Sequence, residues 1–241
     1  MKRFFVRGIN KPAHILAGEN HRHVVVCRLK CGDGVVLCTG NGIDHIGAVE
    51  NISKTETTIT IKNSVINDTE PNIILDLFFS PLTQSNTELI IIKGTELGVS
   101  GFYPTHTKYT QGGAIKLRYD RLEKLILESA KQCGRARLPH INEVKSFESA
   151  VMQVKEYDLA MLCYEGERYR TVFEILKDNI CRPIKKIAVF VGPEGGYHAG
   201  EITSAKDAGL NIVTLGKRIL RAETASIASC AIILQDFDLR R

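Results

Sequence analysis

The spacing of apolar and polar positions divides the chain into two parts. Over the first 70 residues, apolar residues occur in short β-branched runs at 24–29, 34–40, 45–52 and 57–66, and turn sequences such as CGDG and GNGID separate them. Short strands in so few residues predict a compact β-barrel-like module over residues 1–70. The polar stretch INDTEPN that follows predicts a domain boundary.

From residue 73 to residue 241, apolar runs alternate with helical patterns. The apolar runs cover 73–79, 159–164, 186–192 and 211–216, and helical patterns occupy 83–98, 118–133 and 223–237, among others. Strands separated by helices predict an α/β domain with a largely parallel sheet. Because runs such as IAVFV are apolar throughout, we expect helices to cover both faces of this sheet.

The amino-acid composition is that of a globular protein. The 241 residues are 44% hydrophobic and 24% charged, which is ordinary for a globular protein, and no apolar run approaches the roughly 20 residues of a membrane helix. No signal-like apolar stretch follows the start MKRFFVRGIN, so we expect a cytoplasmic protein. The seven cysteines include no C-x-x-C pair, which favours reduced thiols. His21, His23, Cys27 and Cys31 match no standard zinc spacing, and we expect no metal site.

Positive charge is concentrated in one segment. The formal net charge is +5, and residues 101–145 hold nine Lys or Arg against four Asp or Glu, which is also +5. Clustered positive charge is typical of proteins that bind a phosphate backbone. The alternative is a solvated helix face, because RLEKLILESAKQ reads as an ordinary amphipathic helix. The basic residues are 108, 116, 118, 121, 124, 131, 135, 137 and 145.

Three segments that follow predicted strands carry the candidate chemistry. They are CYEGE (163–167), FVGPEGGY (190–197) and TLGKRILRAETA (214–225). Ligands of open α/β sheets bind beyond the carboxyl ends of the strands, so these three loops are predicted to form one pocket. The glycine-rich loop matches neither G-x-G-x-x-G nor a phosphate-binding G-K-[ST] loop. A purely structural turn is the alternative for GPEGG.

Two of these motifs together resemble a known family. VGPEGGYHAGEI followed by LGKRILRAETA is similar to the SPOUT superfamily of knotted methyltransferases, and within it to the bacterial family that methylates N3 of a uridine in 16S ribosomal RNA. ELGVSGFYPTHTKY and ESAKQCGRARLPHI resemble two further segments of that family, and the N-terminal part resembles its PUA-type barrel. The sequence departs from the family pattern at Lys131, Cys133 and Ala222, and in YHAGE.

The resemblance implies a fold and a cofactor. It implies a SPOUT-type trefoil-knotted α/β domain over residues 73–241, preceded by a PUA-like β-barrel RNA-binding domain over residues 1–70, and a homodimer. It implies that S-adenosylmethionine binds in the knot, against loop main chain that small residues expose. The cofactor-binding residues that it implies are Leu162, Cys163, Gly192, Pro193, Glu194, Gly195, Gly196, Leu215, Gly216, Ile219, Leu220, Arg221, Thr224 and Ala225.

Arg221 and Glu223 are the candidate catalytic residues. Methylation at N3 of uracil removes the imide proton, and an arginine aimed at the carbonyl oxygens would stabilise the resulting negative charge. The alternatives are an Arg221–Glu223 salt bridge that shapes the loop, and capping of the final helix by Glu223 and Thr224. Glu194 would favour the cationic sulfonium, or would serve as a structural cap.

RNA contacts are assigned to basic side chains, each of which has an ordinary surface charge as its alternative. The candidates are Arg3, Arg7, Lys93, Arg118, Arg135 and Arg137. The expected function is therefore S-adenosylmethionine-dependent methylation of N3 of a uridine in 16S ribosomal RNA of the small subunit. Two alternatives are a non-catalytic RNA-binding or ribosome-assembly factor with a vestigial knot, and a knotted methyltransferase that acts on another RNA.

Overall fold

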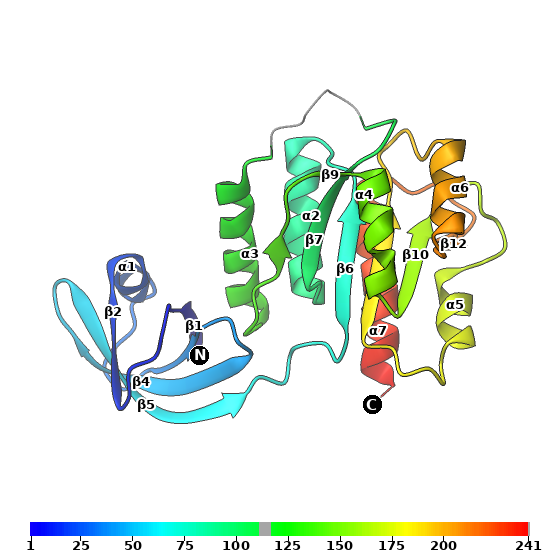
Figure 1. Cartoon of the computed structure of the whole chain (residues 1–241). Helices are drawn as coiled ribbons and strands as arrows, with labels where there is room; N and C mark the ends of the chain where they lie inside the picture. The colour runs from blue at the N-terminus through cyan, green and yellow to red at the C-terminus, as the bar shows by residue number, and fades with distance from the viewer. Residues whose placement is uncertain (111–116, 241) are drawn as a thin grey trace. The chain divides into compact units, whose positions relative to one another are not determined.

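The computed structural model describes residues 1–110 and 117–240, and Figure 1 traces the chain through them. Lys116, one of the basic residues of the positively charged segment, lies outside the described residues. The chain forms two compact units. The first consists of Met1–Glu70 together with Leu127–Leu138, and the second of Pro71–Ile126 together with Pro139–Arg241.

The first unit is built on a five-stranded sheet with the order β1-β3-β4-β5-β2. Neighbouring strands are antiparallel except for β1 and β3, which are parallel. Buried side chains such as Phe4, Leu37 and Ile59 form its own hydrophobic core. This sheet fits the predicted small barrel. The strands are β1 (Lys2–Phe5), β2 (Ala13–Ala17), β3 (Gly34–Cys38), β4 (Ile43–Ile52) and β5 (Glu56–Ile66).

One predicted strand of this unit is a helix. The run at 24–29 begins inside α1 (Gly18–Val26), and the Cys27 N–H donates to the His23 carbonyl at its end. Val24 is fully buried with Phe4 and Leu16, whereas Val25 and Val26 are exposed. Burial of Val24 in the core therefore outweighs the preference of three consecutive valines for a β-strand.

The second unit contains a seven-stranded sheet with the order β12-β10-β11-β6-β7-β8, and β9 also pairs with β7. Every recorded pairing in it is parallel, which confirms the predicted largely parallel sheet. The four apolar runs became β6, β10, β11 and β12. The strands are β6 (Ile74–Phe79), β7 (Gly101–His106), β8 (His140–Ile141), β9 (Lys145–Ser146), β10 (Leu159–Cys163), β11 (Lys186–Val191) and β12 (Asn211–Val213).

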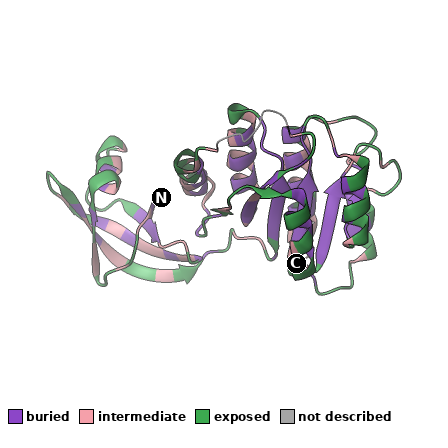
Figure 2. Cartoon of the chain, turned by 45° about the horizontal axis from the view of Figure 1, so that its top comes forward, coloured by how far each residue is buried: buried purple, intermediate pink, exposed green. Residues whose placement is uncertain are grey.

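Side chains alternate between the two faces of this sheet. Leu75, Leu77 and Val189 enter one core with α2, α5 and α7, while Phe78 and Phe190 enter a second core with α4 and α6. Figure 2 shows the central strands buried along their length and the outer helix faces exposed. Both faces are covered, as the continuous apolar runs predict. The helices are α2 (Gln84–Leu97), α3 (Tyr119–Cys133), α4 (Phe147–Met152), η1 (Gln153–Glu156), α5 (Val172–Asp178), α6 (Ala199–Asp207) and α7 (Ala222–Leu239).

Among the described residues, none of the helices has the length and apolar character that crossing a membrane requires. All seven cysteines are free. In residues 1–110 and 117–240, no three His, Cys, Asp or Glu side chains gather as a metal site would require.

Candidate active site

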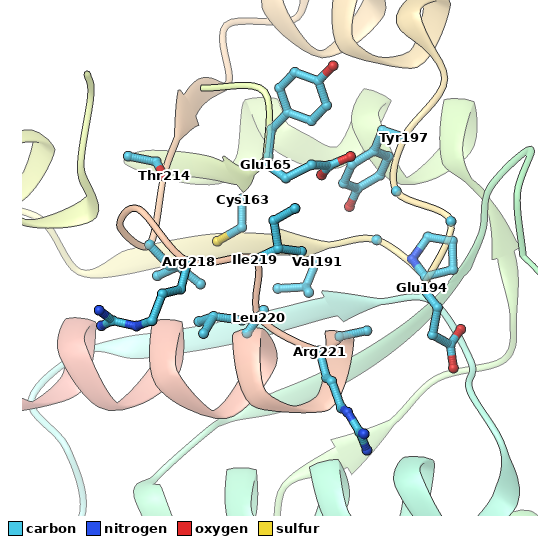
Figure 3. Close-up of a pocket in the computed structure, with 18 of the residues that line it drawn as sticks. Cys163, Glu165, Val191, Glu194, Tyr197, Thr214, Arg218, Ile219, Leu220 and Arg221 are labelled. Atoms are coloured by element: carbon cyan, nitrogen blue, oxygen red, sulfur yellow. The ribbon is translucent and has the colours of Figure 1, made fainter. Parts of the chain in front are cut away.

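Three loops meet at the carboxyl ends of β10, β11 and β12, which are neighbours in the sheet. They line a cavity of about 470 Å³, inside the roughly 300–1,000 Å³ typical of small-molecule sites. Figure 3 shows side chains of all three loops around this cavity. The predicted pocket is therefore present, and all the predicted cofactor-binding residues except Leu162 and Thr224 line it.

The two exceptions lie elsewhere. Leu162 is fully buried in the core that faces α4 and α6, because neighbouring residues of β10 alternate between the faces of the sheet. Cys163, the next residue, lies on the other face and lines the cavity. Burial raises the pKa of the Cys163 thiol to about 12, so it stays protonated at neutral pH. Thr224 is exposed in the first turn of α7.

The glycine-rich loop is a tight turn in which the Gly196 N–H donates to the Pro193 carbonyl at 3.0 Å. Gly196 has φ +70°, a conformation that residues with a Cβ rarely adopt. A Cβ at Gly192 would lie 3.0 Å from the ring of buried Tyr197, and one at Gly196 would collide with the Glu165 carboxylate. These glycines are thus needed to accommodate the protein's own side chains around the cavity.

The third loop begins with a hydrogen-bonded turn. The Thr214 hydroxyl donates to the Gly216 carbonyl at 3.1 Å and accepts from the Gly216 N–H at 3.2 Å, and Gly216 has φ +114°. Thr214 is itself fixed by its N–H, which donates to the Arg170 carbonyl at 2.8 Å. Beyond the turn, Ile219 is 85% exposed although it is apolar. The loop therefore holds its main chain firmly while presenting an apolar side chain at the cavity.

Arg221 is the N-cap residue of α7, and its side chain points away from Glu165 and Tyr197 on the other side of the cavity (Figure 3). Within the part of the chain that the structure describes, its guanidinium makes no ion pair, so the alternative of a salt bridge to Glu223 is not realised. Glu223 is 8% exposed in the first helical turn. The interpretation of Thr224 as a cap is wrong, because the cap lies at Arg221 and no side chain caps this helix.

Sequence reasoning missed several residues of the cavity. Glu165 adds a carboxylate, and Lys217 and Arg218 add exposed cations. The sequence does hold a signal for all three, because they lie inside the loops CYEGE and TLGKRILRAETA. The other lining residues that were missed are Tyr164, Val191, Tyr197, Thr214 and Ala222.

Two of the predicted RNA-binding arginines are buried in ion pairs instead. Arg3 binds Asp44 through both terminal nitrogens, and its side chain is 10% exposed. Arg135 is 4% exposed and binds Glu70 through Nε at 3.2 Å and Nη2 at 3.0 Å. Both arginines stabilise the first unit, and neither presents a free guanidinium to a phosphate.

The other predicted RNA-binding residues are accessible. Arg7 and Arg137 in the first unit and Arg118 in the second are exposed. Lys93 is half-exposed and pairs with Glu96 at 2.8 Å on the surface of α2. Exposed ion pairs of this kind are weak, so that lysine is still available to a phosphate.

Comparison with known proteins connects this arrangement to a family. A family model described as an RNA methyltransferase domain matches residues 69–234. Ribosomal RNA small subunit methyltransferase E of Mesomycoplasma hyopneumoniae is 30% identical over 232 residues, covering 94% of this chain and 96% of that protein. The Bacillus subtilis protein of the same name is 25% identical over 254 residues, covering 100% of this chain and 99% of the relative.

A solved structure agrees with the whole fold. The crystal structure of a ribosomal RNA small subunit methyltransferase E from Neisseria gonorrhoeae, bound to S-adenosyl methionine, superimposes with a TM-score of 0.86 at 25% identity. The match covers 98% of this chain and 97% of that chain. This chain therefore belongs to the RNA methyltransferase family that includes the ribosomal RNA small subunit methyltransferases E.

Proposed function

We propose that this chain methylates N3 of a uridine in 16S ribosomal RNA, with S-adenosylmethionine as the methyl donor. The observation that carries the proposal is the cavity of about 470 Å³ at the ends of β10, β11 and β12, in a chain of this family. The Neisseria gonorrhoeae relative is bound to S-adenosyl methionine, which supports the choice of donor. We assign the action of the chain to the cytoplasm, where ribosomal RNA is made and assembled in bacteria.

The residues around the cavity fit this donor. S-adenosylmethionine consists of an adenosine, whose adenine ring makes apolar contacts, and a methionine part that carries a sulfonium, an ammonium and a carboxylate. The cavity offers carboxylates at Glu165 and Glu194 for the positive groups, and cations at Lys217 and Arg218 for the negative one. Leu215 and Ile219 supply apolar contact for the adenine, and Ile219 is 85% exposed and so available to it. The Glu165 carboxylate would also accept hydrogen bonds from ribose hydroxyls.

The threaded topology is part of the proposal. We infer that the loop at 214–222 and helix α7 pass through the preceding loops as a trefoil knot. The order β12-β10-β11-β6 supports this, since the chain leaves β12 at the end of the sheet and returns as α7 to pack against β11 and β6. Knots are nearly absent from other folds, so the inference rests on family membership.

The chemistry requires little more than position and charge. When bound, S-adenosylmethionine supplies a methyl group activated by positive sulfur. Arg221 is exposed at the cavity without an ion-pair partner in the described residues, and it would stabilise the negative charge that develops on the uracil carbonyl oxygens. Glu223, the second residue of α7, is nearly buried and is the second catalytic candidate. It would act by positioning the start of that helix, where Arg221 is the N-cap residue.

The RNA partner and the oligomer complete the proposal. We assign phosphate contacts to Arg7, Lys93, Arg118 and Arg137, and the substrate to the small ribosomal subunit. We further propose a homodimer, as the family resemblance implies. Helices α5 and α7 contact one another, and Phe173 and Ile232 on them are 62% and 39% exposed. Such apolar exposure on adjoining helices supports a protein interface.

One experiment tests the function. Small ribosomal subunits that lack the modification are incubated with the protein and methyl-labelled S-adenosylmethionine, and the 16S RNA is digested to nucleosides. We expect label in 3-methyluridine from a single site. If transfer RNA is assayed in parallel, label there, or in a ribose methyl group, would favour the alternative of a knotted methyltransferase with a different RNA target. Absence of label together with binding to the subunit would favour the assembly factor, and either result contradicts the proposal.

A further inference from the structure

The described part of the segment after β7 does not line the cavity, but hydrogen bonds connect it to the end of the glycine-rich loop. After β7, the Lys108 N–H donates to Glu201 Oε1 at 2.9 Å, and the other oxygen of that carboxylate accepts from the His198 N–H at 2.8 Å. Glu201 is 8% exposed, so both hydrogen bonds are shielded from water. One buried carboxylate therefore fastens the segment after β7 to the turn that begins α6.

These bonds place Tyr109 beside the cavity. A Cβ at Gly195 would lie 3.0 Å from the Tyr109 Cβ and 3.6 Å from its carbonyl oxygen, and Gly195 lines the cavity. The Tyr109 ring meets the His198 ring edge-on, with centroids 5.9 Å apart and planes at 73°. Tyr109 therefore lies at the rim of the cavity, and its ring packs against His198 on one side.

The main chain under this tyrosine is also fixed. The Thr107 N–H donates to the Thr110 hydroxyl at 2.8 Å, and the Thr110 N–H donates to the Thr107 carbonyl at 3.1 Å. Below the turn, the Ser80 hydroxyl at the end of β6 donates to the Thr105 carbonyl at 3.1 Å. A ring on such a turn loses little conformational freedom when something binds to it.

Much of the Tyr109 side chain is nevertheless exposed to solvent. It is 43% exposed, and within residues 1–110 and 117–240 its hydroxyl has no hydrogen-bond partner. The other tyrosines at the cavity are differently placed. Tyr197 is buried at 7% exposure, and the Tyr164 ring is turned back over Gly166. Tyr109 is thus an aromatic side chain at this rim that can receive a flat ligand.

We propose that Tyr109 is the stacking platform for the acceptor uracil. The inference rests on the proposed function, because N3 lies on the pairing edge of uracil, so the base must be unpaired and reach the active site from a single strand or by extrusion. Proteins hold such extruded bases by stacking them on aromatic side chains. A uracil stacked on Tyr109 lies next to Gly195, and Arg221 lines the same cavity. Tyr109 would therefore hold the ring of the base, while Arg221 in the loop before α7 would provide the positive charge.

Tyrosine substitutions test the proposal. Tyr109→Ala, Tyr109→Leu and Tyr109→Phe are compared in methyl transfer to small subunits, and S-adenosylmethionine affinity is measured by calorimetry. Tyr109→Ala should lower kcat/KM for RNA by about 5- to 150-fold, the usual loss for one base stack. Tyr109→Leu should resemble it, while Tyr109→Phe should stay close to wild type. Cofactor affinity should be unchanged in all three.

The matched control is Tyr169→Ala, which removes a tyrosine that is 83% exposed in the same unit and does not line the cavity. It should keep wild-type activity. Wild-type kcat/KM in Tyr109→Ala would overturn the stacking role, and so would an equal loss of cofactor affinity, which would assign the ring to the cofactor. A wild-type protein that methylates no uridine would contradict the proposed function itself and remove the basis of this inference.

Discussion

The carboxylate of Glu165 lies against the main chain of Gly196, in the space that a Cβ at position 196 would occupy. Glu165 follows β10 and Gly196 follows β11, so this contact joins two of the three loops around the cavity. The glycine also needs its left-handed backbone, with φ +70°. Any side chain at 196 therefore displaces a carboxylate from the cavity and strains the turn at the same time.

Replacement of Gly196 by alanine should weaken the binding of S-adenosylmethionine. The added methyl group displaces the Glu165 carboxylate from the cavity, and the loop relieves about 1–2 kcal/mol of left-handed strain by leaving the conformation that forms the cavity. Binding must restore that conformation, so we expect a loss of affinity of about tenfold or more. Calorimetric titration measures it. Gly209→Ala is the matched control, because Gly209 has φ +89° with nothing near its missing Cβ. That variant should lose stability but bind the cofactor normally, and normal binding by Gly196→Ala would refute the role of this contact.

Arg221→Ala should slow methyl transfer far more than it weakens cofactor binding. Its guanidinium has no ion-pair partner in the described residues and points away from Glu165, which suits a group that meets the acceptor. Loss of one donor to a developing oxyanion typically lowers kcat by roughly 100- to 1,000-fold. Single-turnover assays with saturating cofactor measure this rate. Arg221→Lys keeps the charge without the planar fork and should fall in between. Turnover at the wild-type rate in Arg221→Ala would end the catalytic assignment.

Binding to RNA should depend steeply on salt, and Arg137 should contribute to that dependence. Its side chain is exposed, while its main-chain N–H donates to Glu70 at 2.8 Å and holds it in place. Arg137→Ala should reduce the slope of log affinity against log salt by about 1. Filter binding of 16S RNA over a salt series measures the slope. Lys206→Ala on α6 removes the same charge from another exposed position and should leave the slope unchanged. Equal slopes for wild type and Arg137→Ala would contradict the phosphate contact.

The Arg3–Asp44 pair should stabilise the first unit in a pH-dependent way. Burial works to raise the pKa of Asp44, but hydrogen bonds from Arg3 and Asn67 and the charge of Arg3 outweigh it and lower the pKa below its ordinary value. A carboxylate with a lowered pKa contributes stability above its unfolded pKa, and loses it as the pH falls through the folded pKa.

Asp44→Asn should therefore destabilise the protein most at neutral pH, by up to about 3 kcal/mol, since it leaves Arg3 nearly buried without its partner charge. The difference from wild type should shrink as the pH falls below about 4. Urea unfolding at several pH values gives both quantities. A difference that stays constant from neutral to acidic pH would show that the pair contributes no charge-dependent stability.

The sequence predicts most of the second unit because its strands are apolar on both faces. Runs such as IAVFV have no polar residue that would favour solvent, so they become central strands, and the loops after them meet at one edge. The helix at Gly18–Val26 could not be predicted in this way, since three consecutive valines favour a strand by local propensity. The burial of Val24 among distant residues favours the helix instead.

The roles of single charged residues were harder to predict than the loops that carry them. Arg3 and Arg135 read as surface cations, but their partners Asp44 and Glu70 lie 41 and 65 residues away in the chain. Contacts over such separations exist only after folding. The same holds for Glu201 and Lys108, which are 93 residues apart and together place Tyr109. Sequence motifs therefore locate the cavity, whereas ion pairs and hydrogen bonds between residues far apart in the chain depend on the folded structure.

The most direct test of the account is a crystal structure of the protein grown with S-adenosylmethionine. We expect the donor to occupy the cavity between the loops after β10, β11 and β12, with its adenine against the main chain near Leu215 and Leu220 and its methyl group open toward Arg221. A donor bound elsewhere, or a cavity without donor at saturating donor concentration, would contradict this expectation.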